Sequence, residues 1–392
     1  MQEYIPRQLE KLVLRYLSVF PAVAILGPRQ VGKSTLAKKM GLQLERFLYL
    51  DLQNYEDLNR LTEPALFFEA NKDSVVCIDE IQLKPDLFSI LRSVIDKNRS
   101  NGRFILLGLA SPDIIGKASE SLAGRIGFIH LTPFLISEIT KLESYSLQRY
   151  WLRGGFPQSY LDLSDSNSRL WLENFIRTYI ERDLPQVAFK IPPPLMRRLM
   201  HMCAHNQGQM LNSSKLASSL GLTQPTVRRY IDLLEQTFLM RLLLPYEHYI
   251  KKRLVRSPKT YIRDSGILHS LLGISDFNSL LGHSVFGASW EGVVIENCIK
   301  NMPDWTPSFY RTSGGNEIDL VLARNAQKIA VVCKASAAPQ LNKGNCSALE
   351  DIKPDHTLII APISGQSYQL SQGNLVSGLP EAISILQKWG EG

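Results

Sequence analysis

The stretch that decides the fold is Gly27-Pro-Arg-Gln-Val-Gly-Lys-Ser34. It matches the pattern G-x-x-x-x-G-K-[S/T], in which a glycine-rich loop curls its backbone N–H groups around phosphate oxygens. An apolar run, Val23–Gly27, precedes the motif, and the residues from Thr35 to Met40 are predicted to continue as a helix. This strand–loop–helix order is the context that the chemistry requires, because the helix N-terminus adds partial positive charge at the phosphates. The predicted nucleotide-binding residues are Gly27, Pro28, Arg29, Gln30, Val31, Gly32, Lys33, Ser34 and Thr35.

A second motif, Val75-Val-Cys-Ile-Asp79-Glu80, is an apolar strand that ends in two acids. We expect Lys33 to contact the β- and γ-phosphates, while Ser34 and Asp79 hold Mg2+. Glu80 is placed to orient and deprotonate the attacking water. The acidic pair, and the lack of an N-K-x-D-like motif for reading guanine, favour ATP as the nucleotide. The two motifs together predict a magnesium-dependent ATPase.

Residues 1 to about 165 alternate short apolar runs with helical stretches, which predicts an α/β domain with a parallel sheet. The predicted strands are residues 23–27, 46–51, 75–79, 104–108 and 128–131. For a P-loop ATPase of this kind we expect the strand order 5-1-4-3-2. Ser111, after the fourth strand, is a candidate sensor of the γ-phosphate. Arg125 completes the predicted catalytic set, as a phosphate contact in cis or as an arginine finger on a neighbouring subunit.

Length and composition indicate how many domains the chain has and in which compartment it acts. The 392 residues suggest two or three domains, and no apolar run approaches the roughly 20 residues that a membrane-spanning helix needs. The five cysteines are scattered without a Cys-x-x-Cys pair, which argues against a disulfide framework and a zinc site. No secretion signal is seen at the N-terminus, so a cytoplasmic location is expected. The net charge of +7 fits a nucleic-acid partner.

A helix-turn-helix is predicted between residues 211 and 235. Apolar residues at helical spacing would bury one face of each helix, which leaves Arg228 and Arg229 outward near the start of the second helix, where such folds meet DNA. Residues 238–244 and 260–262 are predicted to form the strands of a wing. Lys251, Lys252 and Arg253 lie in the loop between those strands. The alternative is a winged helix that serves only packing or partner contacts.

The whole chain resembles the bacterial and archaeal AAA+-type ATPases that carry a C-terminal domain of unknown function. Besides the two phosphate-site motifs, the matching segments are Tyr4-Ile-Pro-Arg7, Leu122-Ala-Gly-Arg125, Leu131-Thr-Pro-Phe134 with Glu138, Arg153-Gly-Gly-Phe-Pro157, Tyr179-Ile-Glu-Arg-Asp183, residues 226–235, Pro258-Lys-Thr-Tyr-Ile-Arg-Asp264 and Gly315-Asn-Glu-Ile-Asp319. The resemblance implies an ATPase domain, a winged-helix region and a nuclease-like C-terminal domain.

The C-terminal part resembles the restriction-endonuclease-like core, in which an Asp and a Glu-x-Lys on adjacent strands hold Mg2+. Asp319 and Lys334 match that pattern, whereas Val332 stands where the second acid is expected. Only Glu291 or Glu296, from a predicted helix, are left to supplement the site. We therefore expect a degenerate nuclease site.

These observations predict three domains: an AAA+-like ATPase at residues 1–165, a helical and winged-helix region at 166–262, and a nuclease-like domain at 263–392. The expected function is an ATP-hydrolysing switch that binds double-stranded DNA. An ATP-dependent nuclease and an ATPase that remodels a protein partner without DNA are the alternatives. A homo-oligomer is left open, and no membrane partner is expected.

Overall fold

The computed structural model describes residues 4–109, 122–184, 191–246, 255–370 and 373–391. The chain divides into two compact units. Unit 1 comprises Met1–Phe134, Glu181–Lys190 and Gln236–Phe238, and unit 2 comprises Leu135–Ile180, Ile191–Glu235 and Leu239–Gly392. This division does not test the predicted boundaries at residues 165 and 262, which stay predictions. Within the described residues, no helix is long and apolar enough to cross a membrane.

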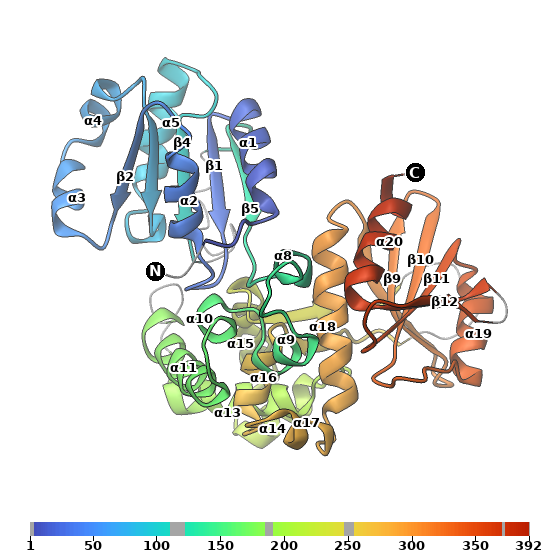
Figure 1. Cartoon of the computed structure of the whole chain (residues 1–392). Coiled ribbons are helices and arrows are strands. Elements are labelled where there is room, and N and C mark those ends of the chain that lie inside the picture. The colour runs from blue at the N-terminus through green and yellow to red at the C-terminus, as the bar shows by residue number, and fades with distance from the viewer. Residues whose placement is uncertain (1–3, 110–121, 185–190, 247–254, 371–372, 392) are drawn as a thin grey trace. The chain divides into compact units, whose positions relative to one another are not determined.

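Unit 1 is built on a five-stranded parallel sheet in the order β2-β3-β4-β1-β5 (Figure 1). Read from its other edge, this is the order 5-1-4-3-2 that the sequence predicted. The strands are β1 (Ala22–Leu26), β2 (Phe47–Asp51), β3 (Val75–Asp79), β4 (Phe104–Gly108) and β5 (Ile126–His130). The helices of this unit are α1 (Leu9–Val19), α2 (Lys33–Gly41), α3 (Tyr55–Arg60), α4 (Pro64–Ala70), η1 (Ile81–Leu83) and α5 (Leu87–Lys97).

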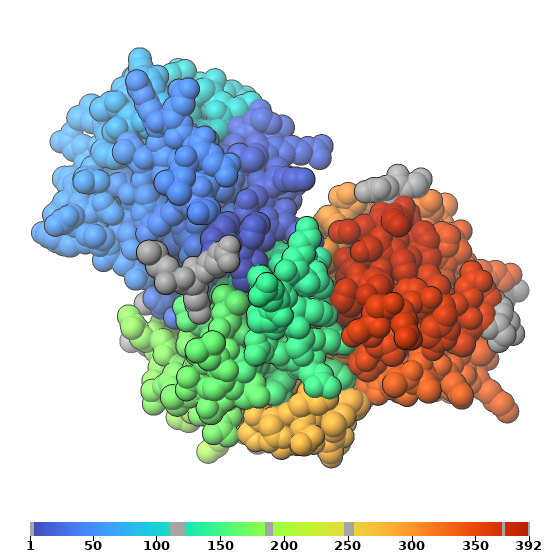
Figure 2. All heavy atoms as spheres, in the orientation of Figure 1, coloured from blue at the N-terminus to red at the C-terminus, as the bar shows by residue number. Residues whose placement is uncertain are grey.

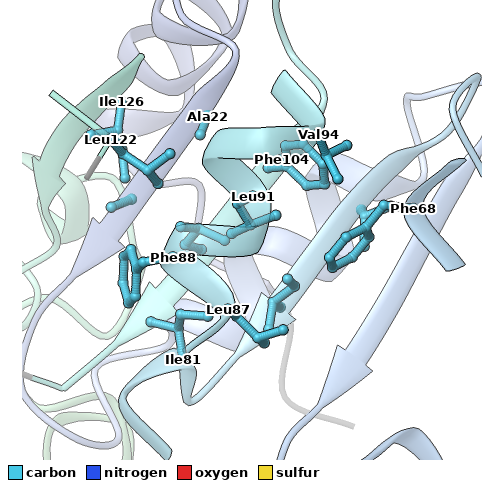
Figure 3. Close-up of a cluster of buried hydrophobic side chains, with 14 of the residues drawn as sticks. Ala22, Phe68, Ile81, Leu87, Phe88, Leu91, Val94, Phe104, Leu122 and Ile126 are labelled. Carbon is cyan, nitrogen blue, oxygen red and sulfur yellow. The ribbon is translucent and has the colours of Figure 1, made fainter. Parts of the chain in front are cut away.

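The core of unit 1 explains why its strands read as unbroken apolar runs. Every residue of β1 and β4 is buried, because helices cover both faces of the sheet. On one face, α5 presents Leu87, Phe88 and Leu91 to the sheet, as Figure 3 shows. Parallel strands place their carboxyl ends at one edge, so the P-loop after β1 and the acids of β3 meet there.

Unit 2 begins with helices and ends with a mixed sheet. Its helices are α8 (Ile136–Ile139), α9 (Leu147–Arg153), α10 (Pro157–Tyr160), α11 (Asp165–Thr178), α13 (Pro193–His205), α14 (Ser213–Leu220), α15 (Gln224–Gln236), α16 (Ser265–Leu271), α17 (Phe277–Leu281), α18 (Phe286–Asn301), α19 (Lys343–Ile352) and α20 (Leu379–Glu391). The π-helical turn η2 (Tyr179–Asp183) continues directly from α11.

The mixed sheet of unit 2 has the order β12-β13-β11-β10-β9-β8. Its strands are β8 (Thr306–Arg311), β9 (Glu317–Arg324), β10 (Gln327–Cys333), β11 (His356–Ala361), β12 (Ser367–Gln369) and β13 (Leu375–Gly378). Strands β8, β9 and β10 are antiparallel neighbours, whereas β10, β11 and β13 run parallel. The space-filling view of Figure 2 shows residues of α20, in red, at the surface of this part of the unit.

A separate two-stranded hairpin pairs β6 (Met240–Leu243) with β7 (Lys259–Ile262). These correspond to the two strands predicted for the wing at residues 238–244 and 260–262, although three of the four bounds differ. The first strand begins at Met240, because Phe238 has a φ of 64°, which an extended strand does not accommodate. The predicted strand start at residue 238 was therefore wrong by two residues.

Candidate nucleotide site

Two glycines of the P-loop are fixed by the space and backbone angles around them. A Cβ on Gly27 would lie 2.1 Å from the carbonyl oxygen of Leu131, which follows β5. Gly32, just before α2, has a φ of 97°, a left-handed conformation that favours glycine. The loop therefore turns tightly from β1 into α2, which begins at Lys33.

Arg7 holds this loop by hydrogen bonds to backbone carbonyl oxygens, a role that the sequence did not indicate. Its guanidinium donates to the carbonyl oxygens of Val31 at 2.8 Å and Thr132 at 2.6 Å, and lies over the ring of Phe134. The side chain is buried, so these bonds replace its hydration. Although Arg7 is part of a segment that carries the family resemblance, its distance in sequence from the loop gave no structural signal.

Lys33 lies inside the curl of the loop. Its ammonium donates to the carbonyl oxygens of Gly27 and Pro28, each at 2.9 Å. Burial lowers the pKa of Lys33 to about 8, although the carboxylates of Glu80 and Asp79 oppose that shift. An ammonium held this close to the loop is positioned to exchange backbone carbonyls for phosphate oxygens.

Ser34 and Asp79, the two residues predicted to hold Mg2+, lie in contact. The Ser34 hydroxyl donates to Asp79 Oδ2 at 2.5 Å, and Tyr49 on β2 donates to the same oxygen. Burial, followed by this bond, raises the pKa of Tyr49 well above its ordinary value, so its hydroxyl stays a donor. The Ser34 hydroxyl in the first turn of α2 and the Asp79 carboxylate at the end of β3 are the hard oxygen ligands that Mg2+ prefers, so these residues fit the ion.

Glu80 follows Asp79 with a φ of 57°. Gln82 donates its amide to the Glu80 carboxylate, while the Leu109 backbone N–H, just past β4, donates to Gln82 Oε1 at 3.4 Å. The carboxylate is thus held at the carboxyl edge of the sheet. The motif at the end of β3 indicates Glu80, but no local signal indicates the amide that holds it.

Arg125 lies away from this site. Its carbonyl oxygen accepts from the N–H of Ala22, the first residue of β1, and its guanidinium pairs with Asp96 at 2.6 Å. The P-loop follows the other end of β1, which at about 3.3 Å per residue is a whole strand length away. The prediction that Arg125 contacts the phosphates in cis was therefore wrong. The alternative, that Arg125 acts as an arginine finger in trans, stays a prediction. Ser111 lies outside the described residues.

Arg29, the third residue of the loop, pairs with Asp183 at the end of η2. The Asp183 side chain is 1% exposed, whereas that of Arg29 is 22% exposed. Asp183 belongs to a segment that carries the family resemblance, but the sequence predicts no role for it. Nothing in the local sequence indicated that two residues 154 positions apart would pair.

The predicted helix-turn-helix residues form two helices joined by a short turn. The side chain of Asn212 caps α14, which ends at Gly221 with a φ of 66° before α15 begins. Leu216, Val227 and Ile231 are buried. Arg228 and Arg229 are exposed on α15, and Arg228 pairs with Asp232 at 3.0 Å. Lys251, Lys252 and Arg253 lie outside the described residues.

The residues predicted for the degenerate nuclease site do not pair with each other. Lys334 donates to Asn345 at 2.9 Å, whereas Asp319 accepts from the backbone N–H of Cys333. The degenerate nuclease site at Asp319 and Lys334 stays a prediction, and Cys333, whose N–H bonds to Asp319, is the neighbour of Lys334 in the chain. Glu296, one of the two supplementary acids, is instead paired with Arg241 and Arg263.

Lys259 on β7 lies at the centre of a cluster of three carboxylates, those of Glu291, Glu317 and Asp319. It is 2% exposed and pairs with Glu291 at 2.8 Å, with Glu317, and with Asp319 at 3.9 Å. Burial alone would lower the pKa of Lys259, but these carboxylates outweigh it and raise that pKa. Burial and Glu291 raise the pKa of Asp319 to about 7, with Lys259 opposing them. Across the part of the chain that the structure describes, no group of three His, Cys, Asp or Glu side chains is arranged to hold a metal ion.

Three family models match consecutive parts of the chain. An AAA domain matches residues 19–140, the domain of unknown function DUF8612 matches 144–278, and the domain of unknown function DUF4143 matches 286–382. The AAA match supports an AAA-type ATPase domain and agrees with the P-loop core of unit 1.

Whole-chain relatives are also found. The uncharacterized proteins Rv2008c of Mycobacterium tuberculosis and Mb2031c of Mycobacterium bovis are each 38% identical to this chain, over 89% of this chain and 78% of theirs. An uncharacterized protein of Haemophilus influenzae is 23% identical, over 89% of this chain and 90% of its own. The crystal structure of protein VC1899 from Vibrio cholerae matches 94% of this chain and 98% of its own at 12% identity and a TM-score of 0.22.

Proposed function

We infer what this chain does from the premise that it belongs to the family of AAA-domain proteins that includes Rv2008c of Mycobacterium tuberculosis. We propose that the chain hydrolyses ATP at the carboxyl edge of the unit 1 sheet. The observation that carries this proposal is the 2.5 Å contact between Ser34 of the P-loop and Asp79 of β3, with Lys33 inside the loop. The proposed metal ligand Asp79, the phosphate ligand Lys33 and the candidate base Glu80 therefore all lie at the same edge of the sheet.

The proposed chemistry uses these residues in distinct roles. Lys33 leaves the carbonyls of the loop and binds the β- and γ-phosphate oxygens. Ser34 and Asp79 would hold Mg2+, which would neutralise charge on the phosphates. Glu80 accepts a proton from the attacking water while the oxygen of that water bonds to the γ-phosphorus. The bond between the γ-phosphorus and the β–γ bridging oxygen breaks at the same time. The products are ADP and inorganic phosphate.

The test is steady-state ATP hydrolysis with Mg2+ together with nucleotide-binding measurements. Lys33→Ala should weaken nucleotide binding, because the loop loses its cation. Glu80→Gln should bind ATP like the wild type but turn over roughly 10²- to 10⁴-fold more slowly, the usual worth of a positioned base. Glu69→Gln is the control, an exposed acid on α4 that pairs with Lys97. Wild-type turnover in Glu80→Gln would show that the base has been assigned wrongly.

We further propose that unit 2 binds double-stranded DNA through α14 and α15. The supporting observation is that α15 buries one face while Arg228 and Arg229 are exposed near its start. The hairpin β6–β7, with the basic segment between its strands, is in the chain position of a wing. An ATPase that remodels a protein partner instead is the alternative, and it would lead if no duplex binding were found.

We regard the C-terminal sheet as a degenerate nuclease-like domain that serves binding or structure. Its support is that Asp319 and Val332 lie on the neighbouring strands β9 and β10, so an apolar side chain stands in the second acid's place. In addition, Lys259 neutralises the remaining carboxylates. An ATP-dependent nuclease is therefore the weaker candidate.

A further inference from the structure

The segment Tyr179–Asp183 carries the family resemblance and has no role in the hydrolysis proposed above. It forms η2, a single π-helical turn, a rare element that is frequent at functional sites. The chain leaves unit 2 within this turn, since residues up to Ile180 belong to unit 2 and Glu181 onward to unit 1. The turn thus connects α11 covalently to the part of the chain that contacts the P-loop.

Asp183, at the end of η2, is a carboxylate inside unit 1 that depends on the cations of the nucleotide site. Its side chain is 1% exposed and pairs with Arg29 of the P-loop. Burial raises the pKa of Asp183, while the charges of Arg29, Arg182 and Lys33 oppose that shift. A buried carboxylate without a partner is strongly destabilising. Arg29 is therefore what keeps this carboxylate, and with it the end of η2, in place.

Phosphate and carboxylate oxygens bind a guanidinium in the same way, through charge-assisted hydrogen bonds. We propose that Asp183 is an internal competitor of the nucleotide: its carboxylate holds Arg29 in the nucleotide-free protein, and the phosphates of a bound nucleotide take Arg29 over. Loss of Arg29 leaves a buried carboxylate without its partner, so η2 rearranges when nucleotide binds. This inference rests on the proposed function, because it needs a nucleotide at the P-loop.

The test is a double-mutant cycle on ADP affinity, measured by calorimetry with wild type, Asp183→Asn, Arg29→Ala and the double variant. Asp183→Asn removes the competing charge at nearly constant volume, so ADP should bind about tenfold more tightly, a typical coupling for neighbouring charges. In the Arg29→Ala background the same change should have no effect. Asp96→Asn is the control, because its carboxylate also pairs with an arginine of unit 1, Arg125, but near the amino end of β1. That variant should bind ADP like the wild type.

Two outcomes of the cycle would overturn the proposal. One is an Asp183→Asn affinity equal to or weaker than that of the wild type. The other is equal tightening in both backgrounds, which would indicate a general charge effect that does not act through Arg29. Failure of the wild type to bind ADP would remove the nucleotide site on which both the proposed function and this inference rest. ADP binding that is lost in Lys33→Ala would uphold a nucleotide site at the P-loop whatever the cycle shows, and the hydrolysis assay then tests the proposed function separately.

A second measurement on the wild type keeps the proposal testable if Asp183→Asn does not fold. Hydrogen exchange of peptides covering residues 179–183 reports local opening of η2. The proposal expects faster exchange there when ADP is added. Unchanged or slower exchange would contradict it.

Discussion

At the scale of single residues, His269 shows how burial fixes a protonation state. Its Nδ1 donates to the Leu152 carbonyl oxygen at 2.9 Å, because that oxygen can only accept. Nε2 is then the acceptor for the Ser289 hydroxyl at 2.7 Å, and Trp151 donates to the same hydroxyl oxygen at 2.9 Å. All three polar side chains are satisfied by a neutral imidazole. This arrangement supports packing of α9, α16 and α18 and does not indicate a catalytic base.

The free energy of unfolding should depend on pH through the titration of His269. Burial lowers its pKa to about 4, whereas an unfolded histidine titrates near 6.5. The unfolded state therefore binds more protons between these values, so the contribution of this group is complete above pH ~6.5 and is lost as the pH falls toward 4. The loss should approach about 3 kcal/mol in the free energy of unfolding.

Denaturant unfolding at pH 7.5 and pH 5 checks this expectation. His269→Asn should be less stable at pH 7.5, and its stability should fall less than that of the wild type between the two pH values. His205→Asn is the control, because His205 is exposed on α13. Equal pH dependence in wild type and His269→Asn would show that His269 does not titrate in this way.

At the scale of elements, the turn from β1 into α2 is set by steric limits. We expect Gly27→Ala to destabilise the protein by about 2 kcal/mol or more and to weaken nucleotide binding, because its Cβ would overlap the Leu131 carbonyl oxygen. Thermal unfolding and ADP titration measure the two effects. Gly287→Ala in α18 has open space around its Cβ and should cause neither. Wild-type stability and affinity in Gly27→Ala would show that the loop tolerates a wider turn.

The strands of unit 1 and the helix α2 could be predicted from sequence because each carries a local signal. Short apolar runs such as residues 104–108 gave the strands, and the phosphate motif fixed where β1 ends and α2 begins. The pairings of Arg7, Gln82 and Asp183 could not be predicted, since they join segments distant in sequence or depend on side-chain geometry. Lys259 is a similar case, because its approach to Asp319 and Glu291 exists only after β7 and the C-terminal sheet have packed.

The cluster around Lys259 leads to a prediction for the C-terminal elements. Supercoiled plasmid incubated with the protein, ATP and Mg2+ or Mn2+ should stay uncut, because Val332 supplies no ligand and Lys259 holds the carboxylates of Glu291 and Asp319. Gel electrophoresis of the plasmid is the readout, and Asp319→Ala separates intrinsic activity from a contaminating nuclease. Nicking that disappeared in that variant would restore the nuclease alternative.

At the scale of the whole molecule, the chain passes between the two compact units five times, since unit 1 contains residues 181–190 and 236–238 besides its N-terminal part. The last of these segments follows α15 directly, and η2 follows α11. A nucleotide-driven change in unit 1 can therefore reach the proposed DNA-binding helix along the backbone. This connectivity is the physical reason to expect a switch instead of two independent activities.

The final prediction is that duplex DNA affinity depends both on α15 and on the nucleotide state. Affinity of the wild type should fall with salt at a log–log slope of about 0.9 per phosphate neutralised. If Arg228 reads a base edge, Arg228→Ala should relax sequence discrimination by about 1–3 kcal/mol. Arg169→Ala is a matched control, because Arg169 also forms an i,i+4 pair, with Glu173, on the exposed surface of α11.

Glu80→Gln with ATP is the state in which the switch should be most visible, because the nucleotide would be bound but not hydrolysed. Its affinity for duplex DNA should differ about fivefold or more between the ATP-bound and nucleotide-free protein, the lower range of coupling between two sites. Fluorescence anisotropy of a labelled duplex at low and high salt measures these effects. If no duplex bound at low salt in either nucleotide state, α14 and α15 would serve packing, and the remodelling of a protein partner would become the leading function. If the duplex bound equally in both states, DNA binding would stand, but ATP hydrolysis would have to act on something else.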